Sequence, residues 1–183
     1  MNYLSPSLRR LFVCSLASLM ALIVFKNIHA TGKEEPSLPR IPNGKPFRIS
    51  DHVGKYVALH FLLETECPVC QRHTQTYWKR SKELPEVVQI FIKPDSAGEI
   101  QSWARDLQQN TPIYQDEGAK FAKEFKIPHG YHFHGKVVHY PALVLINPKG
   151  KEMFRYVGKN NGDRFEFEKL VSKIKELDQA HAR

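Results

Sequence analysis

The chain has 183 residues, of which 42% are hydrophobic and 25% are charged. This balance excludes collagen-like, low-complexity and wholly disordered chains, and the length fits one domain with a single core. Lys and Arg outnumber Asp and Glu by 27 to 19, a formal net charge of +8. The charges are interspersed rather than clustered, so this excess does not predict nucleic-acid binding.

The first thirty residues have the pattern of a secretory signal peptide. A polar start ends in Arg9 and Arg10, residues 11–25 carry no charge, and Ile28 and Ala30 suit a cleavage site after Ala30. The apolar run is shorter than the ~18 residues expected of a spanning helix. We therefore predict residues 1–30 as a signal peptide and a periplasmic or secreted mature protein. The alternative is an uncleaved segment, which would hold the protein at a membrane.

The next segments change from loop to core composition. Residues 31–46 contain four Pro and predict a linker, so the folded domain is expected over residues 47–183. Residues 55–63 and 87–93 are nearly continuous apolar runs, which predict strands buried on both faces. Between them, a polar stretch after Cys70 predicts a helix.

The second half predicts two helices, a hairpin and a last helix. Asp95 or Ser96 can cap a helix that ends near Asn110, and Asp116 can cap one that ends near Lys126. The remaining predicted elements are a Gly- and His-rich loop at 127–136, strands at 141–146 and 151–158, and a helix at about 164–179. This order predicts an α/β fold, a central mixed sheet with helices on both faces and a C-terminal hairpin plus helix.

The cysteines form one closely spaced pair. Of the three Cys, Cys14 would leave with the signal peptide, and Cys67 and Cys70 remain in the sequence CPVC. A bond between them closes almost no loop and adds little stability, so their pairing would serve chemistry.

Cys67 lies between a predicted strand and a predicted helix that Pro68 suits at its first position. The helix dipole and free N–H groups there favour a thiolate, so Cys67 is the expected nucleophile and Cys70, one turn further, the buried resolving thiol. The alternatives are inert core thiols or half of a zinc site, for which the mature chain lacks a second Cys pair.

A buried strand that runs into CPVC, and Tyr140-Pro141 leading into ALVLINPKGKEMFRYVG, resemble the thioredoxin superfamily. The similarity spans residues 39–177 and is closest to the exported ResA/TlpA/MauD-like redoxin branch. It implies a thioredoxin-like fold, exchange with thiols and disulfides of envelope proteins, an upstream electron donor and no cofactor. It also implies that Pro141 is a cis-proline beside the sulfurs that presents backbone to a peptide.

The chain departs from this pattern before the first Cys. Glu66 replaces the usual Trp, and Glu64 stands two residues earlier. These carboxylates can disfavour a thiolate, relay protons to the deeper thiol, or be solvated loop acids. Peroxiredoxins place Thr three residues before their reactive Cys, whereas Thr65 is only two before Cys67, which disfavours peroxidase activity.

The segment 129–140 contains His129, His132, His134 and His139. It resembles Sco-type copper chaperones, in which two Cys and one His bind copper, and His139 aligns with that His. The alternative function is therefore a Cu(I) metallochaperone that uses Cys67, Cys70 and His139, although Sco proteins have CxxxC. Otherwise His139 is a loop residue lining the active-site groove, and the other three are solvated or form a weak accessory metal site.

Overall fold

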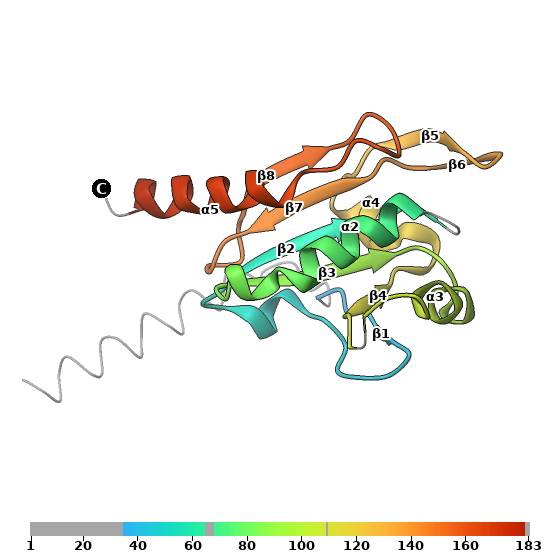
Figure 1. Cartoon of the computed structure of the whole chain (residues 1–183), viewed down its shortest axis with the longest axis horizontal. Helices are drawn as coiled ribbons and strands as arrows, with labels where there is room; N and C mark the ends of the chain where they lie inside the picture. The colour runs from blue at the N-terminus through green and yellow to red at the C-terminus, as the bar shows by residue number, and fades with distance from the viewer. Residues whose placement is uncertain (1–34, 65–67, 109, 182–183) are drawn as a thin grey trace, which may run out of the picture. The chain divides into compact units, whose positions relative to one another are not determined.

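The computed structural model describes residues 35–64, 68–108 and 110–181. Its centre is a six-stranded mixed sheet in the order β1-β4-β3-β2-β7-β8 (Figure 1). The strands are β1 (Arg40–Ile41), β2 (Tyr56–Phe61), β3 (Val87–Lys93), β4 (Ile113–Gln115), β7 (Ala142–Ile146) and β8 (Glu152–Val157). Strands β2, β3 and β4 are parallel to one another, and β7 is antiparallel to both β2 and β8.

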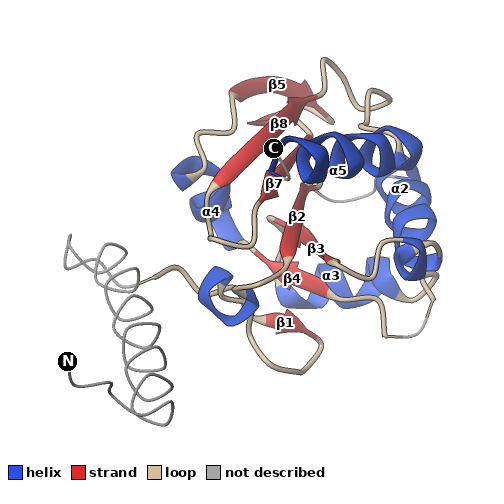
Figure 2. Cartoon of the chain, turned by 90° about the vertical axis from the view of Figure 1, so that its left-hand side faces the viewer, coloured by secondary structure: helices blue, strands red, loops and turns tan. Residues whose placement is uncertain are grey.

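Helices cover both faces of this sheet. The helical segments are η1 (Ile49–His52), α2 (Pro68–Lys79), η2 (Ser81–Glu83), α3 (Ala97–Ala104), η3 (Glu117–Ala119), α4 (Lys120–Glu124) and α5 (Phe167–His181). Figure 2 shows the sheet edge-on, with α2 and α5 on one side and α4 on the other. The prediction of a mixed sheet with helices on both faces and a C-terminal hairpin plus helix is confirmed.

Successive side chains of the central strands point to opposite faces of the sheet and so contribute to two separate hydrophobic cores. In β2, Tyr56 and Ala58 join the core that includes residues of α2, α3 and α5, whereas Val57 and Leu59 join the core that includes residues of α4. The side chains of both sets are buried, as the continuous apolar run predicted. His60 lies on the first of these faces and is fully buried, which makes it a polar group in an apolar layer.

Two predicted helices are shorter in the structure than in the prediction. Helix α3 has the expected Ser96 cap but ends at Ala104 rather than near Asn110. In the second helix, Gly118 and Ala119 have positive φ, so α4 begins only at Lys120. The Asp116 carboxylate still caps this turn, because it accepts hydrogen bonds from the N–H groups of residues 121 and 122.

Three other predictions are wrong in part. The predicted linker contributes β1 and a bridge between Leu38 and Phe47, because their buried side chains add to the core. The predicted loop 127–136 contains most of a hairpin of β5 (His129–Phe133) and β6 (Lys136–His139). Helix α5 begins at Phe167, so Arg164 lies in the preceding loop.

The predicted signal peptide lies outside the described residues. Within the part of the chain that the structure describes, none of the helices combines the length and apolar character that crossing a membrane requires. Strand β4 was missed because Ile113–Gln115 is too short to give a pattern of its own.

Candidate functional site

Residues 68–70 of the CPVC segment form the start of α2, the helix that follows the parallel strand β2. Strand β2 ends at Phe61 and α2 begins at Pro68, so the predicted nucleophile, Cys67, directly precedes this helix in the sequence but lies outside the described residues. Cys70 is in the first turn of α2, is fully buried and is disulfide-bonded. The predicted burial of the second cysteine is confirmed, and Cys67 stays the predicted partner of its disulfide.

A guanidinium reaches this buried sulfur from a distant part of the chain. The Nη2 atom of Arg164 donates to Cys70 Sγ at 3.4 Å, across 94 residues of sequence. The same nitrogen donates to the side-chain oxygen of Asn161 at 3.0 Å. Burial lowers the pKa of Arg164 to about 10 against the attraction of Tyr131 and Asp163, so the group remains a cation at neutral pH.

Hydrogen bonds within the loop and to two neighbouring strands hold the loop that carries Arg164. The Asp163 carboxylate accepts hydrogen bonds from the Tyr156 hydroxyl and from the Lys159 N–H. The Tyr131 hydroxyl, on β5, accepts from the N–H of Asn161 at 3.0 Å. These bonds tie the loop to β8 and to the β5–β6 hairpin, and therefore fix the direction from which Arg164 approaches the sulfur.

Pro141 lies against this loop, but not with the predicted geometry. Among the described residues the cis peptide bond is Ile41–Pro42, so the Tyr140–Pro141 bond is trans and the prediction of a cis bond is wrong. Pro141 directly precedes β7, and its carbonyl accepts from the Gly158 N–H at 2.8 Å. The trans bond thus continues the pairing of β7 with β8. The role of Pro141 in presenting a peptide stays a prediction.

A small cavity lies beside Arg164 and Pro141. Its lining includes His73 of α2, Pro141 and Arg164, and its volume of about 10 Å³ is near that needed by one water molecule. Arg164 therefore contacts Cys70 and shares this cavity with Pro141 and His73.

Three uncharged polar side chains, those of Gln89, His60 and His73, are joined by hydrogen bonds on the α2 side of the sheet. His60 Nε2 is 2.8 Å from Gln89 Oε1, and His60 Nδ1 is 3.0 Å from His73 Nε2. Because Gln89 Oε1 only accepts, His60 donates to it and accepts from His73. Burial lowers the pKa of His60 to about 4, and burial together with the charges of His60 and Arg164 lowers the pKa of His73. Both imidazoles are therefore neutral at pH 7.

A buried ion pair between Lys93 and Asp95 contacts the backbone at Leu63, just after β2. Lys93 Nζ lies 2.9 Å from an Asp95 carboxylate oxygen and donates to the Leu63 carbonyl, also at 2.9 Å. It also lies over the ring of Trp103, 4.6 Å from its centroid. Burial lowers the pKa of Lys93 while the attraction of Asp95 raises it. This cation fixes the exit of β2 toward the CPVC segment.

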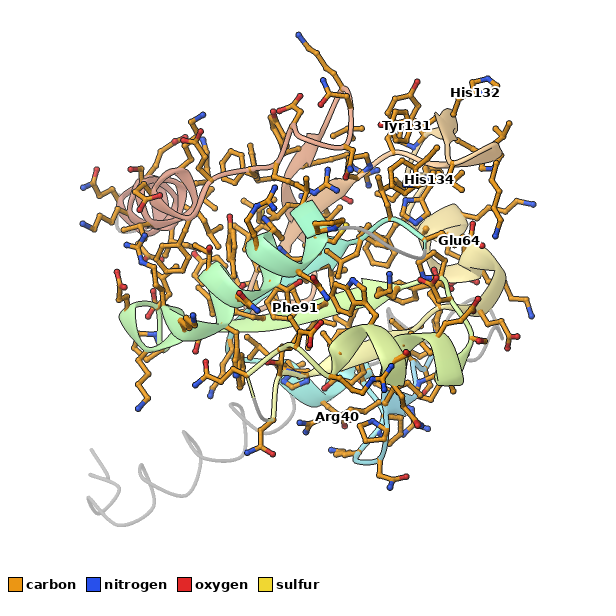
Figure 3. The ribbon with its side chains drawn as sticks, turned by 45° about the vertical axis from the view of Figure 1, so that its right-hand side comes forward. Arg40, Glu64, Phe91, Tyr131, His132 and His134 are labelled. Atoms are coloured by element: carbon orange, nitrogen blue, oxygen red, sulfur yellow. The ribbon has the colours of Figure 1, made fainter. Side chains whose placement is uncertain are left out.

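Of the two acids that precede Cys67, the structure describes Glu64 but not Glu66. Glu64 is half-buried and accepts from Lys136 Nζ of β6 at 2.6 Å, next to the hairpin in Figure 3. This ion pair counters the expectation that Glu64 is a free solvated acid. Glu66 lies outside the described residues, and its predicted roles stay open.

The histidines of the hairpin do not share one environment. His129, His132 and His134 are exposed, as predicted for solvated residues, and Figure 3 shows the last two on the β5–β6 hairpin. His139 is buried in β6, so its assignment to a loop is wrong. Burial lowers the pKa of His139, and its Nδ1 is 2.8 Å from the Tyr140 carbonyl oxygen.

The predicted metal site lies only partly within the described residues. Within the described ranges, no three His, Cys, Asp or Glu side chains are grouped to hold a metal ion. The predicted trio of Cys67, Cys70 and His139 includes a residue outside those ranges.

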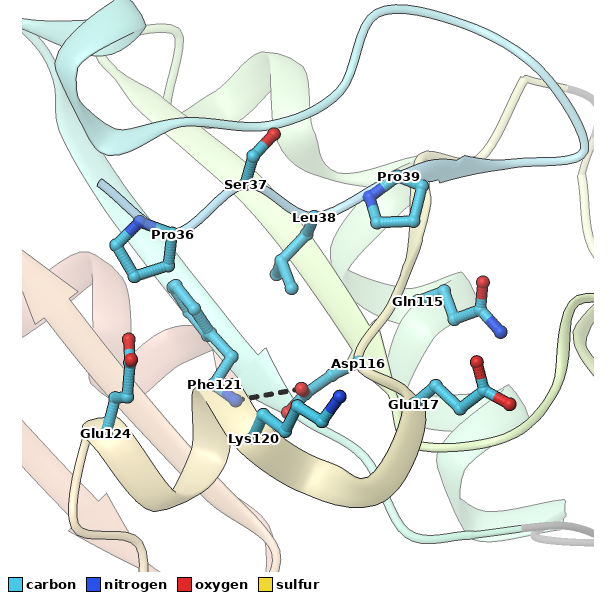
Figure 4. A pocket seen from close by; sticks show the side chains of 10 residues that line it. All are labelled: Pro36, Ser37, Leu38, Pro39, Gln115, Asp116, Glu117, Lys120, Phe121 and Glu124. Carbon is cyan, nitrogen blue, oxygen red and sulfur yellow. Dashed lines mark hydrogen bonds between the residues drawn. The ribbon is translucent and has the colours of Figure 1, made fainter. Parts of the chain in front are cut away.

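A larger surface pocket lies near the start of the described domain and not at Cys70. Figure 4 shows its lining by Pro36, Leu38 and neighbouring residues on one side and by the η3–α4 segment on the other. Its volume is about 360 Å³. Because Leu38 and Phe121 belong to the core on the α4 face, this pocket lies on the opposite face from Cys70.

Sequence reasoning missed Arg164, His60 and His73. His60 interrupts the apolar run KYVALHFLL, and His73 follows Cys70 by three residues, one helical turn. Those two positions were detectable signals of a buried polar pair. Arg164 gave no comparable signal, because its contact with Cys70 depends on the order of the strands.

Comparisons with known proteins identify the family and the fold of the chain. A family model described as AhpC/TSA family matches residues 34–152. A yeast mitochondrial 1-Cys peroxiredoxin is 14% identical with a TM-score of 0.69, covering 81% of this chain and 75% of that chain. A mutant of Xylella fastidiosa PrxQ is 15% identical with a TM-score of 0.63, covering 81% and 90%.

A third similar solved structure is that of a disulfide oxidoreductase. A secreted Mycobacterium tuberculosis disulfide oxidoreductase, described as homologous to E. coli DsbE, is 17% identical with a TM-score of 0.58, covering 78% of this chain and 96% of that chain. These likenesses confirm the predicted thioredoxin-like fold. A search of curated proteins found no match.

Proposed function

The chain belongs to the AhpC/TSA family of thiol-dependent redox enzymes, and we propose that it is a thiol–disulfide oxidoreductase whose Cys67–Cys70 pair exchanges with cysteines of other proteins. The observation that carries this proposal is the state of Cys70, which is buried at the start of α2 and disulfide-bonded. A cysteine held there cannot reach a protein client itself, so its partner in the disulfide must make the first contact.

The two sulfurs then have different roles. A client thiolate or disulfide exchanges at Cys67, and Cys70 either leaves as the thiolate or attacks the mixed disulfide to release the client. Pro141, beside Arg164 and His73, is the neighbouring backbone against which a client segment would lie.

The cellular setting rests on the first thirty residues. Their signal-peptide pattern supports export, clients among envelope proteins and an upstream electron donor that restores the working form.

Insulin reduction by dithiothreitol tests the proposal. The wild-type chain should accelerate it, Cys67→Ser should abolish the acceleration, and Cys70→Ser should trap a mixed disulfide with the client. Cys14→Ser is the matched control and should behave as wild type. Equal acceleration by the wild type and Cys67→Ser would refute the proposal.

The copper alternative is favoured by one observation at His139. Its Nδ1 is within hydrogen-bond distance of the Tyr140 carbonyl, and an N–H bond there leaves the Nε2 lone pair for a metal, as in many metal-binding histidines. A metallochaperone should retain one equivalent of Cu(I) against a chelator, and His139→Ala should weaken it. Loss of copper to the chelator from the wild type at once would remove this alternative.

A further inference from the structure

The contact between Arg164 and Cys70 changes in strength with the redox state of the sulfur. In the disulfide, Cys70 Sγ is a neutral and weak acceptor at 3.4 Å from Arg164 Nη2. After reduction the same atom can carry a full negative charge, and hydrogen bonds between ionised partners are roughly twice as strong as neutral ones. The guanidinium therefore stabilises the reduced, ionised sulfur more than the disulfide.

The surroundings increase this difference. Cys70 is fully buried, and water screens a charge pair little in such a position. Among the described residues, the titratable groups around Arg164 and Cys70 include the neutral imidazoles of His73, His60 and His139, the Tyr131 phenol and the Asp163 carboxylate. Asp163 already accepts from Tyr156 and the Lys159 N–H, so a thiolate at Cys70 would be an additional anion directly beside the cation.

We propose that Arg164 is a positioning residue that stabilises Cys70 as a thiolate in the reduced protein, and that this makes the chain an oxidant of client dithiols. The inference rests on the proposed function for its client. It assigns the direction of electron flow, which the sequence CPVC leaves open.

The exchange balances as follows. A client thiolate attacks the sulfur of Cys67, a client–Cys67 bond forms, and the Cys67–Cys70 bond breaks with its electron pair going to Cys70 Sγ beside Arg164. The second client thiolate then displaces Cys67. The client dithiol loses two electrons and two protons: the protein gains both electrons, one proton stays on Cys67 and one enters solvent. A partner disulfide of higher potential would restore the protein disulfide.

Redox equilibrium with glutathione tests this inference. Arg164→Gln should shift the equilibrium constant about tenfold toward the disulfide, equivalent to about 30 mV lower potential, whereas Arg164→Lys should shift it less because it retains the charge. Arg155→Gln is the matched control: Arg155 is also half-buried and donates to a backbone carbonyl, that of Phe125, and its equilibrium should equal that of wild type. Equal constants for the wild type and Arg164→Gln would overturn the inference.

A second measurement needs no change at Arg164. In a Cys14→Ser/Cys67→Ser chain, thiolate absorbance at 240 nm reports Cys70 alone. We expect Cys70 to ionise below the ordinary thiol value of about 8.5 despite its burial. Ionisation above that value would overturn the inference even if Arg164→Gln does not fold. If this titration succeeds but the wild type fails to exchange with insulin, the proposed function fails and the Arg164 contact stands.

Discussion

Gly158→Ala tests whether the loop that presents Arg164 is fixed by close backbone packing. A Cβ atom added at Gly158 would lie 2.1 Å from the Asp163 carbonyl oxygen and 3.0 Å from Pro141 Cγ. Ordinary contacts between carbon and carbonyl oxygen are about 3.3 Å or longer, so the loop must move by more than ~1 Å. This movement strains the bond from the Gly158 N–H to the Pro141 carbonyl.

The cost combines two effects. Overpacking costs about 1–3 kcal/mol, and the loss of one backbone hydrogen bond costs about 1 kcal/mol. The expected destabilisation is therefore about 2–4 kcal/mol, which lowers Tm by roughly 5–15 °C for a chain of this size. Because Arg164 follows Asp163, the same change should shift the glutathione equilibrium in the direction of Arg164→Gln.

Thermal unfolding and the glutathione equilibrium measure these two effects. Gly98→Ala is the matched control: Gly98 lies in α3 with open space at its Cβ position, so alanine should stabilise the protein by about 0.5–1 kcal/mol. A Tm of Gly158→Ala equal to that of wild type would show that the loop is not packed as described. A lower Tm with an unchanged redox equilibrium would separate loop packing from the position of Arg164.

Three further outcomes are expected. Because His60 and His73 have pKa values below those of the unfolded chain, unfolding takes up protons below pH 6.5. The free energy of unfolding should reach its full value above that pH and fall toward pH 4 by about 1.4 kcal/mol per pH unit for each histidine. A free energy of unfolding in urea that does not change between pH 6.5 and pH 5 would contradict this. Lys93→Met should lower the free energy of unfolding in urea by about 3–5 kcal/mol, since it leaves buried Asp95 without its cation. The control Lys136→Met changes an exposed lysine and should alter this free energy little. A similar effect of both variants would be inconsistent with a structural role of the Lys93–Asp95 pair. The reduced chain should consume hydrogen peroxide no faster than Cys67→Ser, because Glu64 stands where peroxiredoxins have Thr; rapid consumption would establish a peroxidase instead.

Long apolar segments made much of the fold predictable. The run at 87–93 is β3 from end to end, and the run at 55–63 contains β2. Such segments are buried on both faces, so their composition identifies them without knowledge of their neighbours. The two strands predicted at 141–146 and 151–158 likewise predicted the β7–β8 hairpin, because only residues 147–150 separate them.

The errors occurred where partners distant in the chain decide the structure. Strand β1 has two residues and exists through pairing with β4, which no local pattern in the linker-like segment indicates. The peptide bond before Pro141 is trans because that backbone continues into β7 and bonds to Gly158. The cis bond was predicted from the resemblance to the superfamily, and in this chain the pairing of β7 with β8 favours the trans bond instead.

The site was predictable only in its cysteines. CPVC after a buried strand located Cys70 at the start of a helix, but the surroundings of the sulfur depend on tertiary contacts. Arg164 was assigned to the last helix from its periodicity, although the helix begins at Phe167. In the structure Arg164 contacts Cys70, Phe165 is buried in the core, and the Leu170 N–H bonds to the Glu166 carbonyl at the start of the helix.

The chemistry of the cysteine pair is therefore set by the fold more than by the residues between the sulfurs. One continuous set of contacts runs from Tyr131 on the hairpin to the Asn161 N–H, from the Asn161 side chain to Arg164, and from Arg164 to Cys70. None of these groups is close to CPVC in sequence. Unfolding separates the guanidinium from the sulfur and removes its preference for the reduced state. A folded protein that oxidises its clients should consequently be more stable with its cysteines reduced than with its disulfide formed, since stabilising the reduced pair and stabilising the fold are the same free energy.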